Sequence, residues 1–115
     1  MDGTRIRAMF AVIDAQDWAA LPGFFHPEVV YERPGFPPLH GLDRVMRFYH
    51  EERKITRSVH HIEATAVEDG RAACWGRVEC ELPDGSETTV GFADVYTFEG
   101  DRIHLRRTHF FVPSV

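Results

Sequence analysis

Several features are scarce in this sequence, and their scarcity excludes whole classes of function. No apolar run approaches the ~20 residues that a membrane-spanning helix needs. The 13 lysines and arginines are scattered along the chain and are outnumbered by 18 acidic residues, which gives a net charge of −5. This balance argues against nucleic acid or an anionic membrane as the main partner. We therefore expect neither among the partners of this protein.

Cysteine is also scarce, with only Cys74 and Cys80 present. If both lie on one strand, six steps of about 3.3 Å separate them by about 20 Å. A disulfide needs Cα atoms within about 7 Å, so these two thiols cannot bridge each other there. The N-terminal segment lacks the continuous apolar core and cleavage site of a secretory signal. Two unbridged thiols without an export signal predict a cytoplasmic location.

The signature motifs of cofactor enzymes are missing. The sequence contains no glycine-rich phosphate loop, no dinucleotide fingerprint and no G-x-S-x-G turn. The seven histidines lack metal-ligand spacing, and the adjacent His60 and His61 would face opposite sides of a strand. We therefore predict no metal and no cofactor. A histidine from this pair, or His109, is a candidate acid–base group. We assign that role to His61, the alternative being that His61 lies on the plain surface of the sheet.

Apolar spacing predicts three helices in the first half of the chain. Residues 4–16 carry apolar side chains at helical intervals. Asp17 can cap a second, short helix, and a third is expected from Leu42 to about Arg57. Between the second and third helices lie a predicted short strand, Val29–Glu32, and an irregular stretch rich in proline and glycine.

The second half of the chain changes to a period of two, which is typical of strands. The breaks "EDG", "PDG" and "EGD" each place a glycine beside an acidic residue, as hairpin turns do. The four predicted strands are Val59–Val67, Ala72–Leu82, Glu87–Phe98 and Arg102–Val112.

Helices followed by strands indicate a single α+β domain over residues 1–115. Four consecutive hairpin-linked strands form an antiparallel sheet that twists and curves. Three N-terminal helices can cover only its concave face. The predicted shape is therefore a cone, and the mouth of such a cone commonly forms a ligand pocket.

Three segments carry a resemblance to a known superfamily: "AVIDAQDWAALPGFFHPEVVYERP", "HGLDRVMRFYHEER" and "FADVYTFEGDRIHLRRTHFF". Together they resemble the nuclear-transport-factor-2-like cone fold, and within it the SnoaL-like polyketide cyclases and ketosteroid isomerases. The resemblance covers nearly the whole chain. It implies a small-molecule pocket and, often in this superfamily, a homodimer formed through the outer face of the sheet.

The resemblance transfers only part of the isomerase site. Asp94 falls where ketosteroid isomerases hold a protonated aspartic acid in the oxyanion hole, and Tyr49 falls on the tyrosine that supports that hole. Arg33 occupies the place of the general-base aspartate, and Met9 lies near the place of the tyrosine that contacts the oxyanion. Because a cation cannot abstract the proton, steroid isomerisation by that mechanism is not expected.

Asp94 is the central candidate because it shares a strand face with Val90, Phe92, Tyr96 and Phe98. Apolar walls raise the pKa of a carboxyl group, which suits an acid or base in a pocket. The alternatives are a structural aspartate hydrogen-bonded to a neighbour, or a register that sends its side chain to solvent.

Arg33 is the second candidate. An inward Arg33 could hold an anionic or enolate oxygen, or it could pair with Asp94. If the two pair, Asp94 is ionised and can act as a general base; otherwise it serves as a neutral donor. The alternative is an arginine at the rim with its guanidinium in water.

The predicted ligand-contacting set follows from the same strand faces and the third helix. Trp75 alternates with charged residues and is expected on the outer face, in a dimer contact, although it could instead line the cavity. The register of Arg106 and Arg107 allows only one of them to point inward, and we choose Arg106. The full set is Tyr31, Phe48, Phe92, Tyr96, Arg106 and Phe110.

These features predict a cofactor-independent enzyme that acts on a hydrophobic, polyketide- or terpenoid-like molecule by general acid–base catalysis. Asp94 handles the proton, Arg33 and Tyr49 polarise or orient an oxygen, and a histidine assists. Cyclisation, isomerisation and epoxide opening all meet this requirement. The alternatives are a binding module without turnover and a dimeric scaffold with a vestigial pocket.

Overall fold

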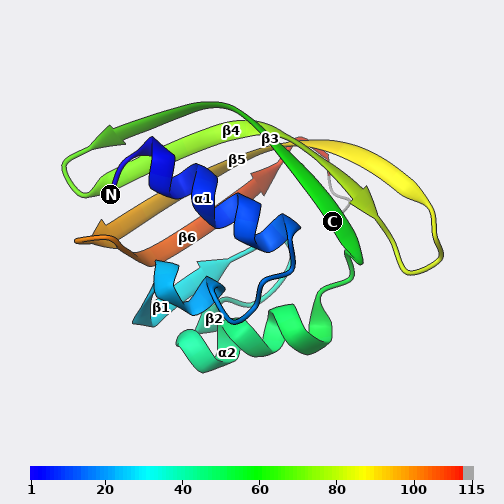
Figure 1. Cartoon of the computed structure of the whole chain (residues 1–115), viewed down its shortest axis with the longest axis horizontal. Coiled ribbons are helices and arrows are strands. Elements are labelled where there is room, and N and C mark those ends of the chain that lie inside the picture. The colour runs from blue at the N-terminus through cyan, green and yellow to red at the C-terminus, as the bar shows by residue number, and fades with distance from the viewer. Residues whose placement is uncertain (113–115) are drawn as a thin grey trace.

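The computed structural model describes residues 1–112, in which two helices pack against one curved sheet (Figure 1). Helix α1 (Gly3–Asp14) begins at Asp2, whose carboxylate accepts the Arg5 backbone N–H at 3.0 Å. Its buried residues recur three and four positions apart, and they press one apolar stripe onto the sheet. They are Ile6, Met9, Phe10 and Ile13.

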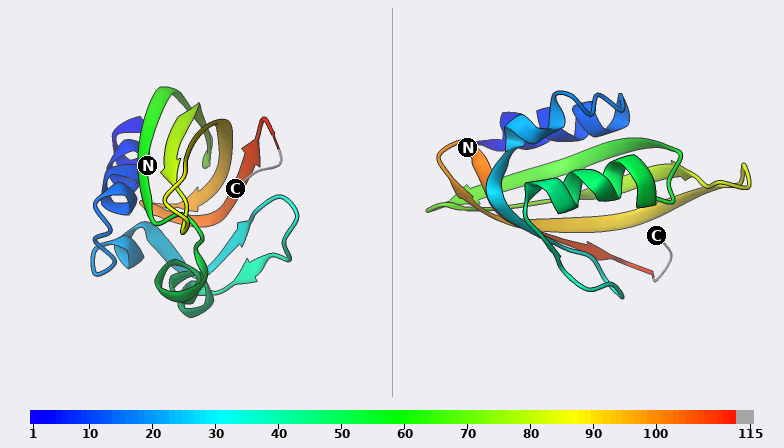
Figure 2. Two further views of the ribbon diagram at one scale, coloured as in Figure 1. Left: turned by 90° about the vertical axis from the view of Figure 1, so that its right-hand side faces the viewer. Right: turned by 90° about the horizontal axis from the view of Figure 1, so that it is seen from below.

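The sheet has six strands in the order β2-β1-β6-β5-β4-β3. All neighbouring pairs are antiparallel except β1 and β6, which run parallel. Figure 2 shows the sheet curling into an open, cone-like shape, with α1 and α2 on its inner side. The strands are β1 (Phe25–Glu32), β2 (Leu39–His40), β3 (Arg57–Glu68), β4 (Arg71–Glu81), β5 (Glu87–Glu99) and β6 (Arg102–Phe110).

Helix α2 (Leu42–Arg47) continues without a break into η2 (Phe48–Glu52), a π-helical segment. The Arg53 backbone N–H donates to the Phe48 carbonyl at 2.8 Å, five residues back. This wider turn leaves Phe48 and Tyr49 both buried against the inside of the cone. Such π-helical segments are frequent at functional sites because they redirect neighbouring side chains.

The expected α+β class and curved sheet are confirmed, but the expectation of three helices is wrong. The predicted second helix is the single 3₁₀ turn η1 (Leu21–Phe24). Pro22 and Gly23 lie inside it, and the chain becomes extended at Phe25, so β1 begins before the predicted residue 29. The stretch from Pro34 to Pro38 is irregular, as expected, and the two-residue strand β2 follows it, with His40 paired to Val30.

The four-strand meander of the second half is also confirmed. Trp75 lies on the outer face, as expected, with 42% of its surface exposed. The two cysteines lie on the inner face as buried free thiols. Within the described part of the chain, no helix combines the length and apolar character needed to cross a membrane.

Candidate functional site

Two neighbouring spaces lie on the inner side of the cone. The inner cavity has a volume of about 30 Å³, and a groove at the mouth of the cone has about 290 Å³. Tyr31, Arg33 and Phe48 line both, so the two spaces adjoin. A volume of about 30 Å³ corresponds to roughly one water molecule. Side chains therefore fill most of the expected funnel, and a ligand the size of a drug would have to lie mainly in the groove.

Asp94 is fully buried on β5, as expected, but it lies behind the cavity wall. Its Oδ2 accepts from the Tyr96 hydroxyl at 2.7 Å and from Arg106 Nε at 2.9 Å. Its Oδ1 has no hydrogen-bond partner within residues 1–112. The cation that pairs with Asp94 is thus Arg106, not Arg33. A guanidinium and a hydroxyl thus both donate to the same carboxylate oxygen.

Arg106 connects the buried carboxylate to the cavity. Its Nη1 donates to the Tyr49 hydroxyl oxygen at 2.7 Å, and its guanidinium lies 4.5 Å from the centre of the Tyr31 ring. Burial alone would lower the pKa of Arg106, but Asp94 and the nearby tyrosines raise that pKa well above its ordinary value. Arg106 is therefore a fixed positive charge in the cavity wall.

Tyr49 faces the same cavity from η2. Burial raises the pKa of Tyr49, although the neighbouring Arg106 lowers it in part. The phenol therefore stays protonated at neutral pH. Because its oxygen already accepts from Arg106, its own O–H is oriented away from that donor and can be given to a ligand oxygen.

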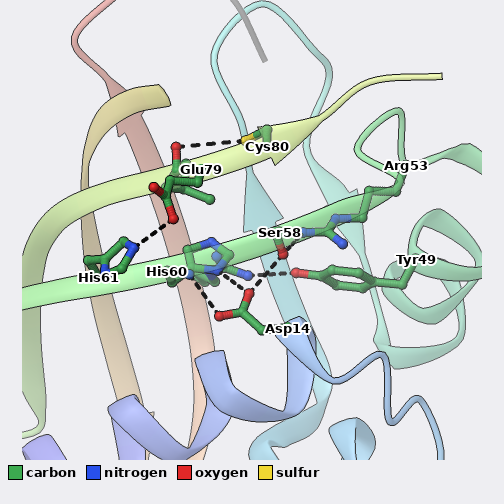
Figure 3. A network of polar contacts seen from close by, with 10 residues as sticks. Asp14, Tyr49, Arg53, Ser58, His60, His61, Glu79 and Cys80 are labelled. Carbon is green, nitrogen blue, oxygen red and sulfur yellow. Dashed lines mark hydrogen bonds and ion pairs between the residues drawn. The ribbon is translucent and has the colours of Figure 1, made fainter. Parts of the chain in front are cut away.

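Asp14 and His60 form a second polar pair at the cavity (Figure 3). Asp14 Oδ1 lies 2.6 Å from His60 Nδ1, and Asp14 Oδ2 accepts the His60 backbone N–H at 2.7 Å. The Ser58 hydroxyl donates to Oδ1 at 2.8 Å. Burial would raise the pKa of Asp14, but the hydrogen bonds and charge of His60, helped by Ser58, lower it overall.

The environment of His60 favours its neutral form. Its ring lies between Phe10, at 4.6 Å between centroids, and Phe92, at 5.5 Å. This burial lowers the pKa of His60, and Asp14 only partly offsets the effect. Since Nδ1–H donates to the Asp14 carboxylate, the lone pair of the neutral imidazole lies on Nε2. His60 lines the inner cavity, so it can act there as a base.

The prediction that His61 is the pocket histidine is wrong. Successive residues of β3 face opposite sides of the sheet, and here His60 turns inward. His61 lies on the outer face, where its Nε2 contacts Glu79 Oε2 at 2.9 Å. The predicted candidate and the residue at the cavity thus differ by one position.

Arg33 lies at the rim, between the inner cavity and the groove. Its guanidinium is 4.7 Å from the centre of the Phe48 ring and 5.4 Å from that of Phe36. Of the predicted ligand-contacting set, Tyr96 is hydrogen-bonded to Asp94 and does not reach the cavity lining. The others all line the cavity: Tyr31, Phe48, Phe92, Arg106 and Phe110.

Two polar residues of this site were missed by the sequence analysis. Arg53 lines the cavity at the end of η2, and its Nη2 donates to Ser58 Oγ at 3.1 Å. The position of Asp14 in the sequence did indicate a special role. It lies four residues after buried Phe10, on the apolar stripe of α1, and is the last residue of that helix. A carboxylate is disfavoured at a helix C-terminus, so it needs partners from elsewhere in the fold.

Among residues 1–112, one group could supply three metal ligands. His26, Glu28 and His104 have ligand atoms within 4.8 Å of one another on the paired strands β1 and β6. However, His26 Nδ1 accepts the Glu28 backbone N–H, and its Nε2 lies 3.2 Å from Glu99. A metal on His26 would have to displace one of these contacts. No local spacing in the sequence indicates this group, because its two histidines lie 78 positions apart in the chain.

A sequence profile of the SnoaL-like domain matches residues 6–105, and the chain therefore belongs to the SnoaL-like domain family. The expected membership of the nuclear-transport-factor-2-like superfamily is confirmed by this match and by solved structures. No curated protein sequence matches the chain significantly.

Three solved structures illustrate the likeness of fold. An NTF2-like protein of unknown function from Burkholderia pseudomallei is 20% identical, with a TM-score of 0.84 over 93% of this chain and 88% of the other. An LEH-like epoxide hydrolase from M. tuberculosis is 15% identical, with a TM-score of 0.82 over 93% and 80%. A candidate polyketide cyclase from Xanthomonas campestris pv. campestris is 14% identical, with a TM-score of 0.82 over 91% and 86%. Identities this low establish the fold alone.

Proposed function

We propose that this protein is a cofactor-independent enzyme that moves a proton on a small, hydrophobic, oxygen-bearing molecule. The observation that carries the proposal is the meeting of two polar systems at one cavity. The Asp14–His60 pair supplies a neutral imidazole base, and the Arg106–Tyr49 pair supplies an O–H donor. A base and an oxygen-stabilising donor in one dry site are the requirements of acid–base catalysis beside a carbonyl.

The proposed step begins with a ligand carbonyl that accepts a hydrogen bond from the Tyr49 O–H. His60 Nε2 removes a proton from the carbon next to that carbonyl, and the electron pair moves to form an enolate. Tyr49 stabilises the new negative charge on oxygen, and Arg106 supports Tyr49 from behind. The proton then returns from His60 to the same carbon or to another one, so that no oxidant or cofactor is consumed.

In this proposal Asp94 takes a different role from the predicted one. It does not line the cavity, and its Oδ2 is occupied by Arg106 and Tyr96. Asp94 is therefore a positioning residue that holds Arg106, and through it Tyr49. The proton-handling group is His60.

The two spaces suit a ligand with a small reacting end. The inner cavity takes the small polar end of the ligand, while the apolar body would lie in the groove. Phe36, Pro37 and Leu39 give the groove its apolar wall. Cyclisation and isomerisation follow from an enolate, and epoxide opening uses the same kind of base and O–H donor; the structural neighbours named as an epoxide hydrolase and a candidate polyketide cyclase agree with that range.

The test uses exchange of the α-protons of 2-tetralone, a flat hydrophobic ketone, followed by ¹H NMR in D₂O. The protein should accelerate exchange above the buffer rate, and His60→Gln should lower that acceleration by about 10²-fold or more. His61→Gln is the matched control, because it changes the neighbouring residue on the opposite face of β3. Equal rates for the two variants, or no acceleration by the unmodified protein, would contradict the proposal.

A non-catalytic binding protein is the second candidate, favoured by the small volume of the inner cavity, about 30 Å³. It predicts that 2-tetralone shifts the NMR signals of groove residues without accelerated exchange. The same experiment therefore separates the two functions.

We also propose a homodimer formed through the outer face of the sheet. Trp75 is 42% exposed there, and its cross-strand neighbours Ala64 and Ala93 are small, so the indole stands above the sheet surface. Val59 is a second exposed apolar residue on β3, at 46%. A second copy of the chain packed on this face would remove the exposed indole from water.

A further inference from the structure

The charges in the wall of the inner cavity are all of one sign. Arg33, Arg53 and Arg106 line it, and no carboxylate of residues 1–112 does. Asp94 and Asp14 each lie one layer behind the wall. This arrangement is unexpected in a chain with a net charge of −5. A cavity lined by cations in a low-dielectric setting favours an anionic group.

Arg53 and Arg106 differ in how their charges are compensated. Arg106 contacts Asp94 directly at 2.9 Å. Arg53 forms no ion pair with the described residues. Its partners are the Ser58 hydroxyl at 3.1 Å and the face of the Tyr49 ring, whose centre lies 5.7 Å away. The acid nearest to it in this network, Asp14, is reached only through Ser58.

Burial also bears on Arg53. It lowers the pKa of this guanidinium, and the neighbouring Tyr49, Tyr31 and Asp14 offset that effect only in part. A half-buried guanidinium keeps several N–H donors in a fixed planar fork. Ser58 uses one of them. The remaining donors are suited to the two oxygens of a carboxylate.

We propose that the ligand of this site carries its own anionic oxygen group, a carboxylate or an ionised enol, and that Arg53 binds it. This inference rests on the proposed function, because it names the substrate class of the same cavity. Tyr49 would donate to the ligand oxygen whose charge changes during the reaction. Arg53, four residues further along the chain, would bind the oxygen group that is charged throughout.

The groove at the mouth of the cone also carries more positive than negative charge. Arg44 and Lys54 line it together with one acid, Glu52. Both oxygens of Glu52 are held by Arg44, at 2.8 and 3.0 Å, and Arg47 lies 3.5 Å away. The acid of the groove is thus already neutralised. An anion approaching from solvent would be attracted along the groove toward Arg53.

The experiment compares two probes that differ in charge. They are 4-oxo-4-phenylbutanoate, a flat keto acid, and its neutral methyl ester; both carry exchangeable protons beside a ketone. Binding is followed by NMR titration and proton exchange by ¹H NMR in D₂O. We expect the protein to bind the acid about tenfold more tightly than the ester, since Arg–carboxylate hydrogen bonds are among the stronger ones. The acid should bind more weakly as salt is added.

Arg53→Gln should abolish the preference for the acid, so that the variant binds the acid and the ester with equal affinity. Arg53→Lys should keep part of the preference for the acid, because lysine retains the positive charge but lacks the planar fork of N–H donors of arginine. The matched control is Arg77→Gln on the exposed outer face of β4. This substitution should change neither the binding nor the proton exchange of the acid or the ester. Thermal unfolding of each variant shows whether it is folded.

The outcomes separate this inference from the proposed function. If the ester exchanges its protons as fast as the acid and Arg53→Gln has no effect, the substrate class is wrong and the acid–base function stands. If the acid binds through Arg53 without exchange, the anion site stands and the catalytic function fails. If the acid does not bind, the anion site is overturned.

Discussion

Asp14 and His60 are 46 positions apart in the chain, yet their side chains meet at 2.6 Å between Oδ1 and Nδ1. The contact joins the C-terminal residue of α1 to the inner face of β3. It is reinforced by a second contact at 2.7 Å from the His60 backbone N–H to the other carboxylate oxygen. The carboxylate therefore fixes both the position of the imidazole and the nitrogen that carries its proton.

Replacing Asp14 should change how the proton-exchange rate depends on pH. Asp14 raises the pKa of His60 against the larger lowering effect of burial. Asp14→Asn removes this support, so the pKa of His60 falls further and the rising limb of the rate–pH profile moves to lower pH. The plateau rate should fall as well, because Asn can stabilise either tautomer of the ring.

Glu79→Gln is the control for this experiment. Glu79 contacts His61 on the outer face of the same strand, at 2.9 Å. Its replacement removes a comparable carboxylate–histidine contact without touching the cavity, and the profile should not move. A rising limb that stays in place in Asp14→Asn would show that His60 is not the titrating base.

Tyr49→Phe tests the donor that faces the ligand oxygen. The substitution keeps the ring, which packs 5.2 Å from Phe48 between centroids and 5.3 Å from Trp18. It removes only the O–H. Loss of one oxyanion donor lowers a rate by about 10²–10³-fold, and we expect an effect of this size on kcat for 2-tetralone exchange. An unchanged kcat with an increased KM would mean that Tyr49 only binds the ligand.

Asp94→Asn should destabilise the fold more than it alters the chemistry. It leaves Arg106, which is 4% exposed, without its carboxylate. Breaking a buried ion pair on one side costs about 3–5 kcal/mol of unfolding free energy. Urea unfolding measures this loss. The double variant Asp94→Asn with Arg106→Met should lose less than the sum of the two single variants, because no unpaired charge remains. Additive losses would contradict a direct pairing.

Trp75→Lys should shift the protein toward the monomer if the outer face forms the dimer. Light scattering coupled to size-exclusion chromatography gives the mass directly, which is 13.2 kDa for one chain. Val67→Lys is the control, since Val67 is exposed to a similar degree, 43%, but lies at the end of β3 near the hairpin. A monomer in the unmodified protein would contradict the proposed dimer.

Local patterns in the sequence predict the α+β class and the four-strand meander, but not the whole architecture. The period-two segments and their acidic glycine turns placed β3 to β6 within one or two residues of their observed bounds. The parallel pairing of β1 with β6 joins segments about 75 residues apart and leaves no local pattern. The second helix was predicted wrongly because apolar spacing outweighed Pro22 and Gly23, which restrict that segment to a single 3₁₀ turn.

The site was harder to predict than the fold because its members act through contacts between distant elements. The burial of Asp94 was foreseen from its strand face, but its partner was not, because Arg106 reaches it from the neighbouring strand β6. The alternation of side chains along a strand shows that His60 and His61 face opposite sides, but it does not show which side is the inner one. Arg53 was missed because its direction depends on the π-helical turn of η2.

The stability of the protein should fall as the solution becomes acidic, in two separate windows. The folded protein lowers the pKa of His60 from its ordinary value of about 6.5. Below that pH, His60 becomes protonated in the unfolded chain but stays neutral in the folded protein. Folding therefore becomes less favourable until the pH reaches the pKa of His60 in the folded protein. The folded protein also lowers the pKa of Asp14, so the stability that Asp14 contributes is present above about pH 3.9 and is lost as the pH falls below that value.

Thermal unfolding between pH 5 and 7.5 isolates the window of His60. The difference in Tm between the unmodified protein and His60→Gln should shrink as the pH falls, because the variant lacks this proton uptake. A difference that stays constant would mean that His60 titrates alike in the folded and unfolded states, and the imidazole would then not be held in a dry, aromatic setting.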